Sequence, residues 1–402
     1  MFLTSVFRLG SGVRELVIAL CVAAAFLAPG KTPSSWATDS SPWALTARPW
    51  PKASALFRTN PHWLGGDGAS SVALGRERIL WLFGDSFVNS GTSGSRRDAV
   101  IVRNSLALQE GTNPALSRLS FFWNSQSETP GSFFKEQETR WFWPGCGIRI
   151  GDRLLLFLLE VKKSENVLGF DLAGWRAALI TNPDKKPECW QLRWLATPSV
   201  YSDMIIGSGS ALVKGLFLYT FGVDRHTHKV YLLRWPLSAI RQGDLSAPQW
   251  HMKDAWREQR PSDPLPTAIF RTGAMEFTVH YDRKIRQYLE METGGLGESS
   301  FFFRSAPTLA GPWSERRPFY RPPETRDAGL MIYAGKAHPG LSGAPLVLTY
   351  VVNAMDYSRL LADRNIYYPV VLRGSFTVPA TFSDCGLPDQ PHPAAQNGLN
   401  RE

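Results

Sequence analysis

A unit of two short strands joined by a tight turn recurs five times along the chain, and this repeat limits the possible folds more than any other feature. Each unit begins with a short strand and continues through a Gly-, Asp- or Arg-containing turn into a strongly apolar strand. The five predicted hairpins are 68–74 with 79–85, 146–150 with 154–160, 208–213 with 216–222, 275–281 with 285–291, and 335–341 with 346–353. Few segments have a helical period, so the chain is predicted to be all-β.

A third strand follows each hairpin and supports the repeat. Four of these segments share an apolar pair before an arginine: 101–108, 231–237, 301–307 and 371–376, whereas 177–183 lacks the arginine. A sheet that is apolar on both faces must be covered on both sides, which radial packing of sheets provides. The sequence therefore predicts a five-bladed β-propeller over residues 61–380. A β-sandwich or two separate β domains remain the alternatives.

The N-terminal region resembles a secretory signal. Arg8 and Arg14 precede an apolar run at 16–27, and a small-x-small pattern ends at Ala37. Twelve apolar residues suit a signal core better than a membrane span. We therefore expect a signal peptide at 1–37, a lead-in segment at 38–60 and a disordered C-terminal tail at 381–402. The protein is expected to be periplasmic or extracellular and monomeric, with no stable membrane insertion after cleavage; an uncleaved anchor is the alternative.

Cysteines, histidines and charge exclude several classes of protein. Cys146, Cys189 and Cys385 remain after the signal, so disulfides do not form the framework. His226 and His228 lie in a turn-like segment without zinc-ligand spacing, so no metal site is predicted. The net charge of +9 comes from scattered basic residues, which argues against nucleic acid as a partner. No organic cofactor is implied, although a structural cation in the channel stays possible.

Acidic residues recur at equivalent ends of the predicted hairpins. The start of the first strand in an antiparallel hairpin lies beside the end of the second, so these positions share one face of the ring. The candidate catalytic residues at such positions are Asp67, Asp85, Glu160 and Glu276. Crowding would raise the pKa of at least one carboxyl group, and one neutral acid beside one ionised carboxylate is what glycoside hydrolysis requires.

Each of these acids also has a structural interpretation. Asp67 has flanking glycines that are typical of an ordinary turn, and Asp85 can accept backbone N–H groups to brace its hairpin. Glu160 follows six apolar residues and would need a partner if it were buried. Glu276 lies at the start of the predicted strand 275–281 and resembles an inward-facing acid. The residue types alone do not separate the two interpretations.

Aromatic and polar residues near the same strand ends are the candidate substrate contacts. The chain has 15 Trp, 23 Phe and 11 Tyr, and aromatic rings both favour strands and stack on sugar faces. The candidate substrate-binding residues are Trp63, Asn104, Trp143, Tyr333, Lys336, His338 and Asn353. The alternative is that the rings fill the channel and that His338 is a core histidine. Carbohydrate is the expected partner.

Several segments resemble a known protein family. They include WLGGDGASSVALGRERILWLFGDSF at 63–87, FWPGCGIRI at 142–150, MEFTVHYD at 275–282 and the YAGKAHP and LVLTYVVN pair at 333–353. The chain is similar here to bacterial five-bladed propellers first catalogued as a domain of unknown function, some of which are endo-D-arabinanases. The GPW element at 311–313 is also similar to the wider arabinanase and β-xylosidase propeller group. The resemblance covers roughly residues 60–375.

The resemblance implies roles for some of the acids. Asp67 would be a central catalytic carboxylate and Asp85 a second acid, without a decision on which is the acid and which the base. The wider group has its general acid on a middle blade. In the third unit Gly222 stands where the acid would be, and Asp224 follows two residues later.

Three functions fit these observations. The first is an exported glycoside hydrolase that acts on an arabinan-type furanoside or related polysaccharide. The second is a non-catalytic glycan-binding propeller, and the third is an envelope scaffold whose channel is filled by side chains. Replacement of Asp67 and Asp85 by Asn would abolish hydrolysis only under the first.

Overall fold

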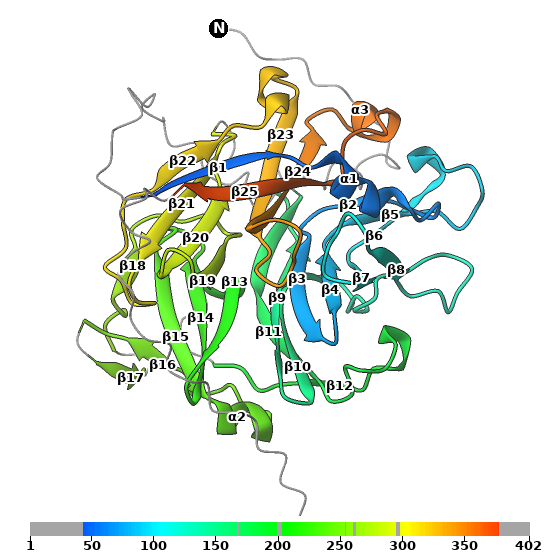
Figure 1. The fold of residues 1–402 in the computed structure, drawn as a ribbon. Helices are drawn as coiled ribbons and strands as arrows, with labels where there is room; N and C mark the ends of the chain where they lie inside the picture. The colour runs from blue at the N-terminus through cyan, green and yellow to red at the C-terminus, as the bar shows by residue number, and fades with distance from the viewer. Residues whose placement is uncertain are drawn as a thin grey trace, which may run out of the picture.

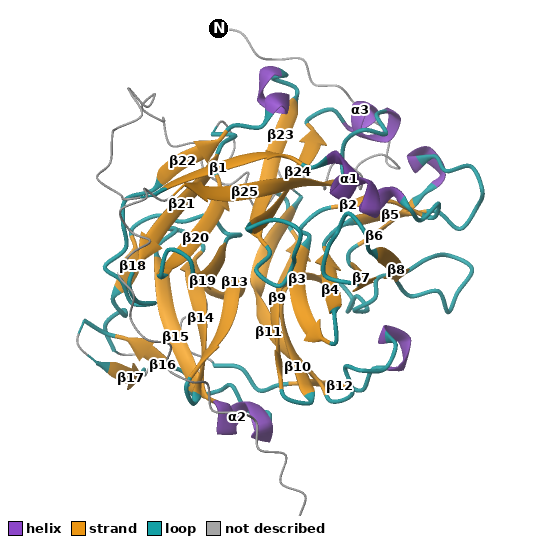
Figure 2. Cartoon of the chain, in the orientation of Figure 1, coloured by secondary structure: helices purple, strands orange, loops and turns teal. Residues whose placement is uncertain are grey.

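The computed structural model describes residues 43–166, 169–198, 203–253, 255–259, 263–294 and 298–377, and these residues are arranged as an all-β protein (Figures 1 and 2). The predicted signal peptide and C-terminal tail lie outside the described residues. The helices are short: α1 (Pro51–Ser54), α2 (Leu237–Gln242), α3 (Tyr357–Ala362) and the 3₁₀ helices Ala55–Arg58, Arg96–Asp98, Pro187–Cys189 and Pro323–Arg326. In the described part of the chain, none of the helices has the length and apolar character needed to cross a membrane. The prediction of an all-β chain is confirmed.

The first large sheet contains the first predicted hairpin. Its strand order is β3 (Ser70–Gly75), β4 (Arg78–Phe83), β7 (Ser105–Glu110) and β8 (Arg118–Phe122). The third strand that was predicted at 101–108 is broken in two. Its first part is β6 (Val100–Val102), which belongs to a small sheet with β2 (Trp63–Gly66) and β5 (Ser86–Val88). The break falls at Arg103 and Asn104, whose side chains make specific contacts described below.

The second and third sheets repeat the hairpin pattern. The second has β9 (Arg140–Ile150), β10 (Arg153–Lys163), β11 (Phe170–Ile180) and β12 (Leu192–Trp194) in that order. The third has β13 (Met204–Lys214), β14 (Phe217–Asp224), β15 (Val230–Pro236), β16 (Gln249–His251) and β17 (Trp256–Glu258), and β18 (Ala268–Phe270) also pairs with β15. The predicted hairpins lie within β9–β10 and β13–β14, although β9 and β13 begin four or more residues earlier than predicted.

The fourth and fifth sheets complete the series. The fourth has β19 (Thr278–Asp282), β20 (Gln287–Thr293), β21 (Phe301–Ala306) and β22 (Arg317–Tyr320). The fifth has β23 (Leu330–Ala337), β24 (Leu346–Ala354), β25 (Pro369–Thr377) and β1 (Ala44–Pro49). The first strand of this last hairpin was predicted at 335–341 but begins at Leu330 and ends at Ala337. The difference arises because the loop from His338 to Pro345 is longer than the tight turn that the pattern suggested.

Burial of both sheet faces explains the long apolar runs. On β10, Leu154, Leu156 and Leu158 pack with a cluster that includes side chains of β3 and β4. The intervening Leu155 and Phe157 pack with side chains of β13 and β14. Because successive side chains of a strand point to opposite faces, the second sheet is covered by the first sheet on one side and the third on the other. A continuous apolar run is therefore required.

The first strands of the five large sheets surround one cavity. Its volume is about 420 Å³, and it is lined by residues of β3, β9, β13, β19 and β23 together with the residues that follow β23. The second strands lie one position further out in every sheet. Residues that are far apart in the sequence therefore meet at the ends of this cavity.

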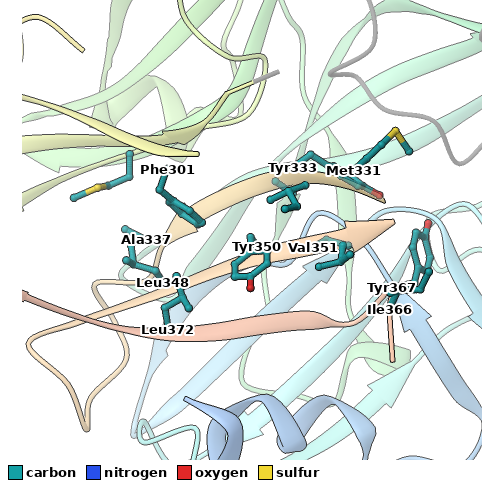
Figure 3. Close-up of a cluster of buried hydrophobic side chains, with 14 of the residues drawn as sticks. Phe301, Met331, Tyr333, Ala337, Leu348, Tyr350, Val351, Ile366, Tyr367 and Leu372 are labelled. Atoms are coloured by element: carbon teal, nitrogen blue, oxygen red, sulfur yellow. The ribbon is translucent and has the colours of Figure 1, made fainter. Parts of the chain in front are cut away.

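The N-terminal strand completes the last sheet. β1 pairs antiparallel with β25, from Ala44 opposite Thr377 to Pro49 opposite Leu372. This part of the expected lead-in segment is thus an outer strand of the fifth sheet. Figure 3 shows part of the core of this sheet, in which Leu348, Tyr350 and Val351 of β24 lie between side chains of β23 and those of the segment 366–372.

Candidate active site

Asp67 and Asp85 lie side by side because the backbone joins their segments. Asp67 follows β2 and precedes β3, and Asp85 stands between β4 and β5. The N–H of Asp67 donates to the carbonyl oxygen of Asp85 at 3.3 Å, and the N–H of Gly84 donates to the carbonyl oxygen of Asp67 at 3.0 Å. The hairpin geometry expected from the sequence brings these two acids together.

The Asp67 carboxyl group is held by two tyrosines from the last sheet region. Tyr333 on β23 donates to Asp67 Oδ2 at 2.9 Å, and Tyr367 donates to the same oxygen at 3.3 Å. Tyr367 also lies 3.1 Å from the carbonyl oxygen of Asp85. Burial, Asp85 and Glu276 together raise the pKa of Asp67 to about 8, against the smaller opposite effect of Tyr333. Asp67 therefore holds a proton near neutral pH, unlike an ordinary aspartate.

Asp85 is more deeply buried than Asp67 and has partners of its own. Its exposure is 2%, and Trp143 Nε1 donates to Oδ1 at 2.9 Å while Arg103 lies 3.4 Å from Oδ2. Burial raises the pKa of Asp85, whereas Arg103 and Trp143 act in the opposite direction. Arg103 belongs to the repeated apolar-pair–arginine pattern, and its position at the break between β6 and β7 lets it reach this carboxylate.

Glu276 reaches the same region from the segment before β19. Lys336 Nζ, on β23, donates to Glu276 Oε1 at 2.9 Å and to the carbonyl oxygen of Gly68 at 2.6 Å. The Lys336 side chain is 2% exposed and that of Glu276 is 22% exposed. Asn353 completes the arrangement, because its amide donates to Tyr333 Oη at 3.2 Å. We call Asp67, Asp85, Glu276, Tyr333, Lys336 and Tyr367 the acid cluster.

The backbone around the acid cluster is strained. Ala69, Ala334 and Tyr367 have φ angles of 50°, 55° and 63°, and all three are buried. Residues other than glycine rarely adopt this left-handed backbone conformation, and strain of this kind is concentrated at functional sites. Gly65 is required nearby, because it has a φ of 119° and a Cβ at this position would lie 2.2 Å from the carbonyl oxygen of Tyr367.

Two of the predicted site residues lie away from the acid cluster. Glu160 is 6% exposed and pairs with Arg140 at 3.1 Å and Arg176 at 3.4 Å, so it has the partners that its burial demands. Trp63 is fully buried, its Nε1 donates to Ser105 Oγ at 3.0 Å, and its ring packs against the ring of Phe121. The ring of Trp63 is therefore part of the core and is covered on its face.

Asn104 and His338 are also buried in specific contacts. Asn104 is fully buried, donates to the carbonyl oxygens of Phe134 and Phe142, and accepts from the N–H of Phe134. It thus ties the first sheet to the segment that enters the second. His338 lies between Ser71 Oγ at 2.8 Å and Thr349 Oγ1 at 2.7 Å, and it lines the central cavity.

The third unit supplies a turn acid. Asp224 accepts hydrogen bonds from the N–H groups of His226 and Thr227, and these bonds lower its pKa despite partial burial. Gly222 packs against the side chain of Met204. Among the described residues no group of three or more His, Cys, Asp or Glu side chains could hold a metal ion.

Tyr367 is the residue of the acid cluster that the sequence analysis missed. It lies in the segment between α3 and β25, outside the hairpins on which the search for site residues depended. Its only local signal is the aromatic pair before Pro369 at the start of the last strand. Such a pair is equally typical of a strand that packs in a core.

The protein resembles solved structures at low sequence identity. A protein from Bacteroides ovatus ATCC 8483, described as a "putative hydrolase", is 17% identical with a TM-score of 0.64, and the match covers 86% of this chain and 96% of that one. An exo-β-1,3-galactanase from Phanerochaete chrysosporium is 12% identical (82% and 63% covered, TM-score 0.45). A GH43_1 enzyme from Xanthomonas citri in complex with xylose is 12% identical (80% and 92% covered, TM-score 0.43). The first of these likenesses shows a shared fold.

A search of curated protein sequences found no match. A family model described as a domain of unknown function, DUF5005, matches residues 52–373. This range extends from α1 to β25 and contains all the residues of the acid cluster. The chain therefore belongs to the DUF5005 family.

Proposed function

We propose that this protein is an exported glycoside hydrolase whose five large sheets are the blades of a five-bladed β-propeller. The observation that carries the proposal is the meeting of Asp67, Asp85 and Glu276 beside Lys336, which lines the central cavity, with the pKa of Asp67 raised to about 8. Perturbed carboxyl groups in a concave site are what acid–base hydrolysis needs. The substrate is a polysaccharide of the arabinan type or a related furanoside, and the protein acts as a periplasmic or extracellular monomer.

The three acids have different tasks in this proposal. Asp67 is neutral near pH 7 and donates its proton to the oxygen of the leaving sugar as the glycosidic bond breaks. Glu276, which has the more exposed carboxylate, takes a proton from the water molecule whose oxygen attacks the anomeric carbon. Asp85 is 2% exposed and acts on Asp67 through its charge. This division corresponds to the acid and base of glycoside hydrolysis.

Lys336 and the tyrosines position these groups. Lys336 binds both Glu276 and the carbonyl oxygen of Gly68, the residue after Asp67, so it fixes one carboxylate relative to the other. Tyr333 and Tyr367 orient Asp67 Oδ2. Positioning of this kind contributes because proton transfer needs heavy atoms at hydrogen-bond distance.

The decisive experiment is product analysis after incubation with arabinan, xylan and cell-wall polysaccharides. The wild type is expected to release sugars from at least one of them, and Asp67→Asn and Glu276→Gln to lower the rate by about 10²–10⁴-fold, the usual contribution of an acid or base. Asp327→Asn is the matched control, because Asp327 pairs with Arg359 at the surface. Release of no sugar by the wild type, with glycan retained on a column, would favour a binding protein instead.

A further inference from the structure

The cavity beneath the acid cluster has a wall whose polar groups the proposed hydrolysis does not use. The cavity has a volume of about 420 Å³, a size that suits a small ligand. His280 of β19 contributes to its lining, and so do Ser210 of β13 and Thr278 of β19. Lys336 connects this space to the acids of the acid cluster, because it lines the cavity while its Nζ binds Glu276.

His280 is the unusual group in this wall. Its side chain belongs to a residue that is 5% exposed, and neither ring nitrogen has a hydrogen-bond partner among the described residues. Burial lowers the pKa of His280 to about 4, so the ring is neutral and offers one N–H donor and one acceptor nitrogen. A buried polar group without a partner is costly, so an ordered water molecule or a ligand is expected at His280.

Two hydroxyl groups add donors to the same wall. Ser210 Oγ accepts from the N–H of Val279 at 2.8 Å, and Thr278 Oγ1 accepts from the N–H of Ala337 at 2.9 Å. Each hydroxyl has thus used an acceptor position and keeps its proton for a further bond. Thr278 and His280 are two residues apart on β19, so their side chains leave the same face of the strand.

The charges around the cavity are of one sign. Its lining contains Lys336 and Arg149 but no aspartate or glutamate side chain. Arg149 is already paired with Asp184, whereas Lys336 has one N–H left beyond its bonds to Glu276 and Gly68. The charged side chains of the wall are therefore cations, each paired with an acid outside the lining, and Lys336 keeps one donor for a ligand.

We propose that the central cavity binds one small oxyanion, with His280, Thr278, Ser210 and Lys336 as its donors. Sulfate, phosphate and a free monocarboxylate share this chemistry, since each presents several acceptor oxygens and a negative charge. The carboxylate oxygens that a divalent cation prefers are absent from the side chains of this wall. The proposal thus replaces the structural cation left open by the sequence with an anion, and it does not depend on hydrolysis.

The test is an NMR titration of the His280 ring in the full-length protein, with the ring signals assigned from a His280→Gln variant. Sodium sulfate, sodium phosphate, sodium acetate and sodium glucuronate are added separately against sodium chloride at equal ionic strength. We expect a saturable shift of the His280 signals with a Kd of about 1 mM or tighter for at least one oxyanion. The four salts distinguish a free inorganic anion from the carboxylate of an acidic sugar.

Conservative variants separate the site from general effects on folding. Thr278→Val and Ser210→Ala should each weaken binding about tenfold by removing one donor to a charged ligand, whereas Thr278→Ser should restore it. His62→Gln is the control, because His62 contacts Asn89 away from the cavity. The proposal is overturned if no oxyanion gives a saturable shift, if Thr278→Val binds as well as the wild type, or if calcium chloride alone shifts the His280 signals.

Discussion

Tyr333 Oη lies 2.9 Å from Asp67 Oδ2. A hydroxyl group on the fifth sheet therefore donates to the carboxyl group of the residue that precedes β3 in the first sheet. The two residues are 266 positions apart in the sequence. This bond stabilises the charged form of the carboxyl group, and it opposes the burial and the neighbouring acids that favour the neutral form. The protonation equilibrium of Asp67 therefore depends on contacts between segments that are far apart in the sequence.

Removal of the Tyr333 hydroxyl should raise the pKa of Asp67 above its value of about 8, because the carboxylate loses a donor. In Tyr333→Phe the alkaline limb of the pH–rate profile is expected to move to higher pH. The same shift should be visible in the carboxyl carbon signal of Asp67 by NMR. Tyr350→Phe is a suitable control, since Tyr350 donates to Glu324 instead. An unchanged Asp67 titration in Tyr333→Phe contradicts the assignment.

Asp67→Asn should stabilise the fold at alkaline pH while it removes activity. The pKa of Asp67 is about 8 in the folded protein, whereas the ordinary value, which applies to the unfolded chain, is 3.8. The folded state therefore binds this proton more tightly than the unfolded state does. The contribution of Asp67 to stability is therefore most favourable below pH 3.8 and becomes unfavourable as the pH rises through 8. Thermal unfolding near the upper value should show a Tm about 3–5 °C above the wild type. The difference should disappear in acid, and a lower Tm for the variant at alkaline pH would be inconsistent with this reasoning.

Lys336 and Glu276 should be strongly coupled in a double-mutant cycle. Lys336→Met leaves the carbonyl oxygen of Gly68 and the Glu276 carboxylate without their ammonium partner. Loss of one partner from such a pair should lower the free energy of unfolding by about 2–3 kcal/mol. This is less than the cost for a fully buried pair, because the Glu276 side chain is partly exposed to solvent. The second change, Glu276→Gln, should cost less in the Lys336→Met background than alone. Denaturant unfolding of the four proteins measures this, and additive effects would mean that the pair is not coupled.

Deletion of residues 43–49 should destabilise the fifth sheet and expose β25. β1 contributes backbone hydrogen bonds along six paired positions, and Trp43 and Leu45 are buried in the core of that sheet. An uncovered edge strand is a template for association with other chains. We expect a lower Tm together with soluble aggregates in light scattering. Thr46→Ala keeps the strand and is the control, and a monomeric deletion variant of unchanged Tm would refute the role assigned to β1.

Local sequence patterns were sufficient for the five hairpins but not for the outer strands or for the most distant strand partners. The five hairpins were predicted because each joins neighbouring segments through a short turn, and alternation of burial on two faces explains runs such as 154–160. The pairing of β1 with β25 was not predicted, because the local sequence of a short strand does not indicate a partner strand more than 300 residues away. Strand pairing of this kind is decided by closure of the whole fold.

The acid cluster was predictable only in part for the same reason. Asp67, Asp85 and Glu276 stand at hairpin ends, so antiparallel pairing places them on one face. Glu160 occupies the equivalent end of its own hairpin, yet Arg140 and Arg176 lie close enough to pair with it. The position of a residue in a strand predicts at which end of the sheet it lies. The contacts of its side chain depend on residues from other strands, which this position does not predict.

The pairing of β1 with β25 also sets the order in which the molecule can be completed. A ribosome releases residues 44–49 long before residues 369–377 exist, so β1 has no partner strand until β25 has been synthesised. Tyr333 and Tyr367 emerge 266 and 300 residues after Asp67. The nascent chain therefore carries Asp67 without the groups that hold it until these later residues have been synthesised, and only then can the acid cluster assemble.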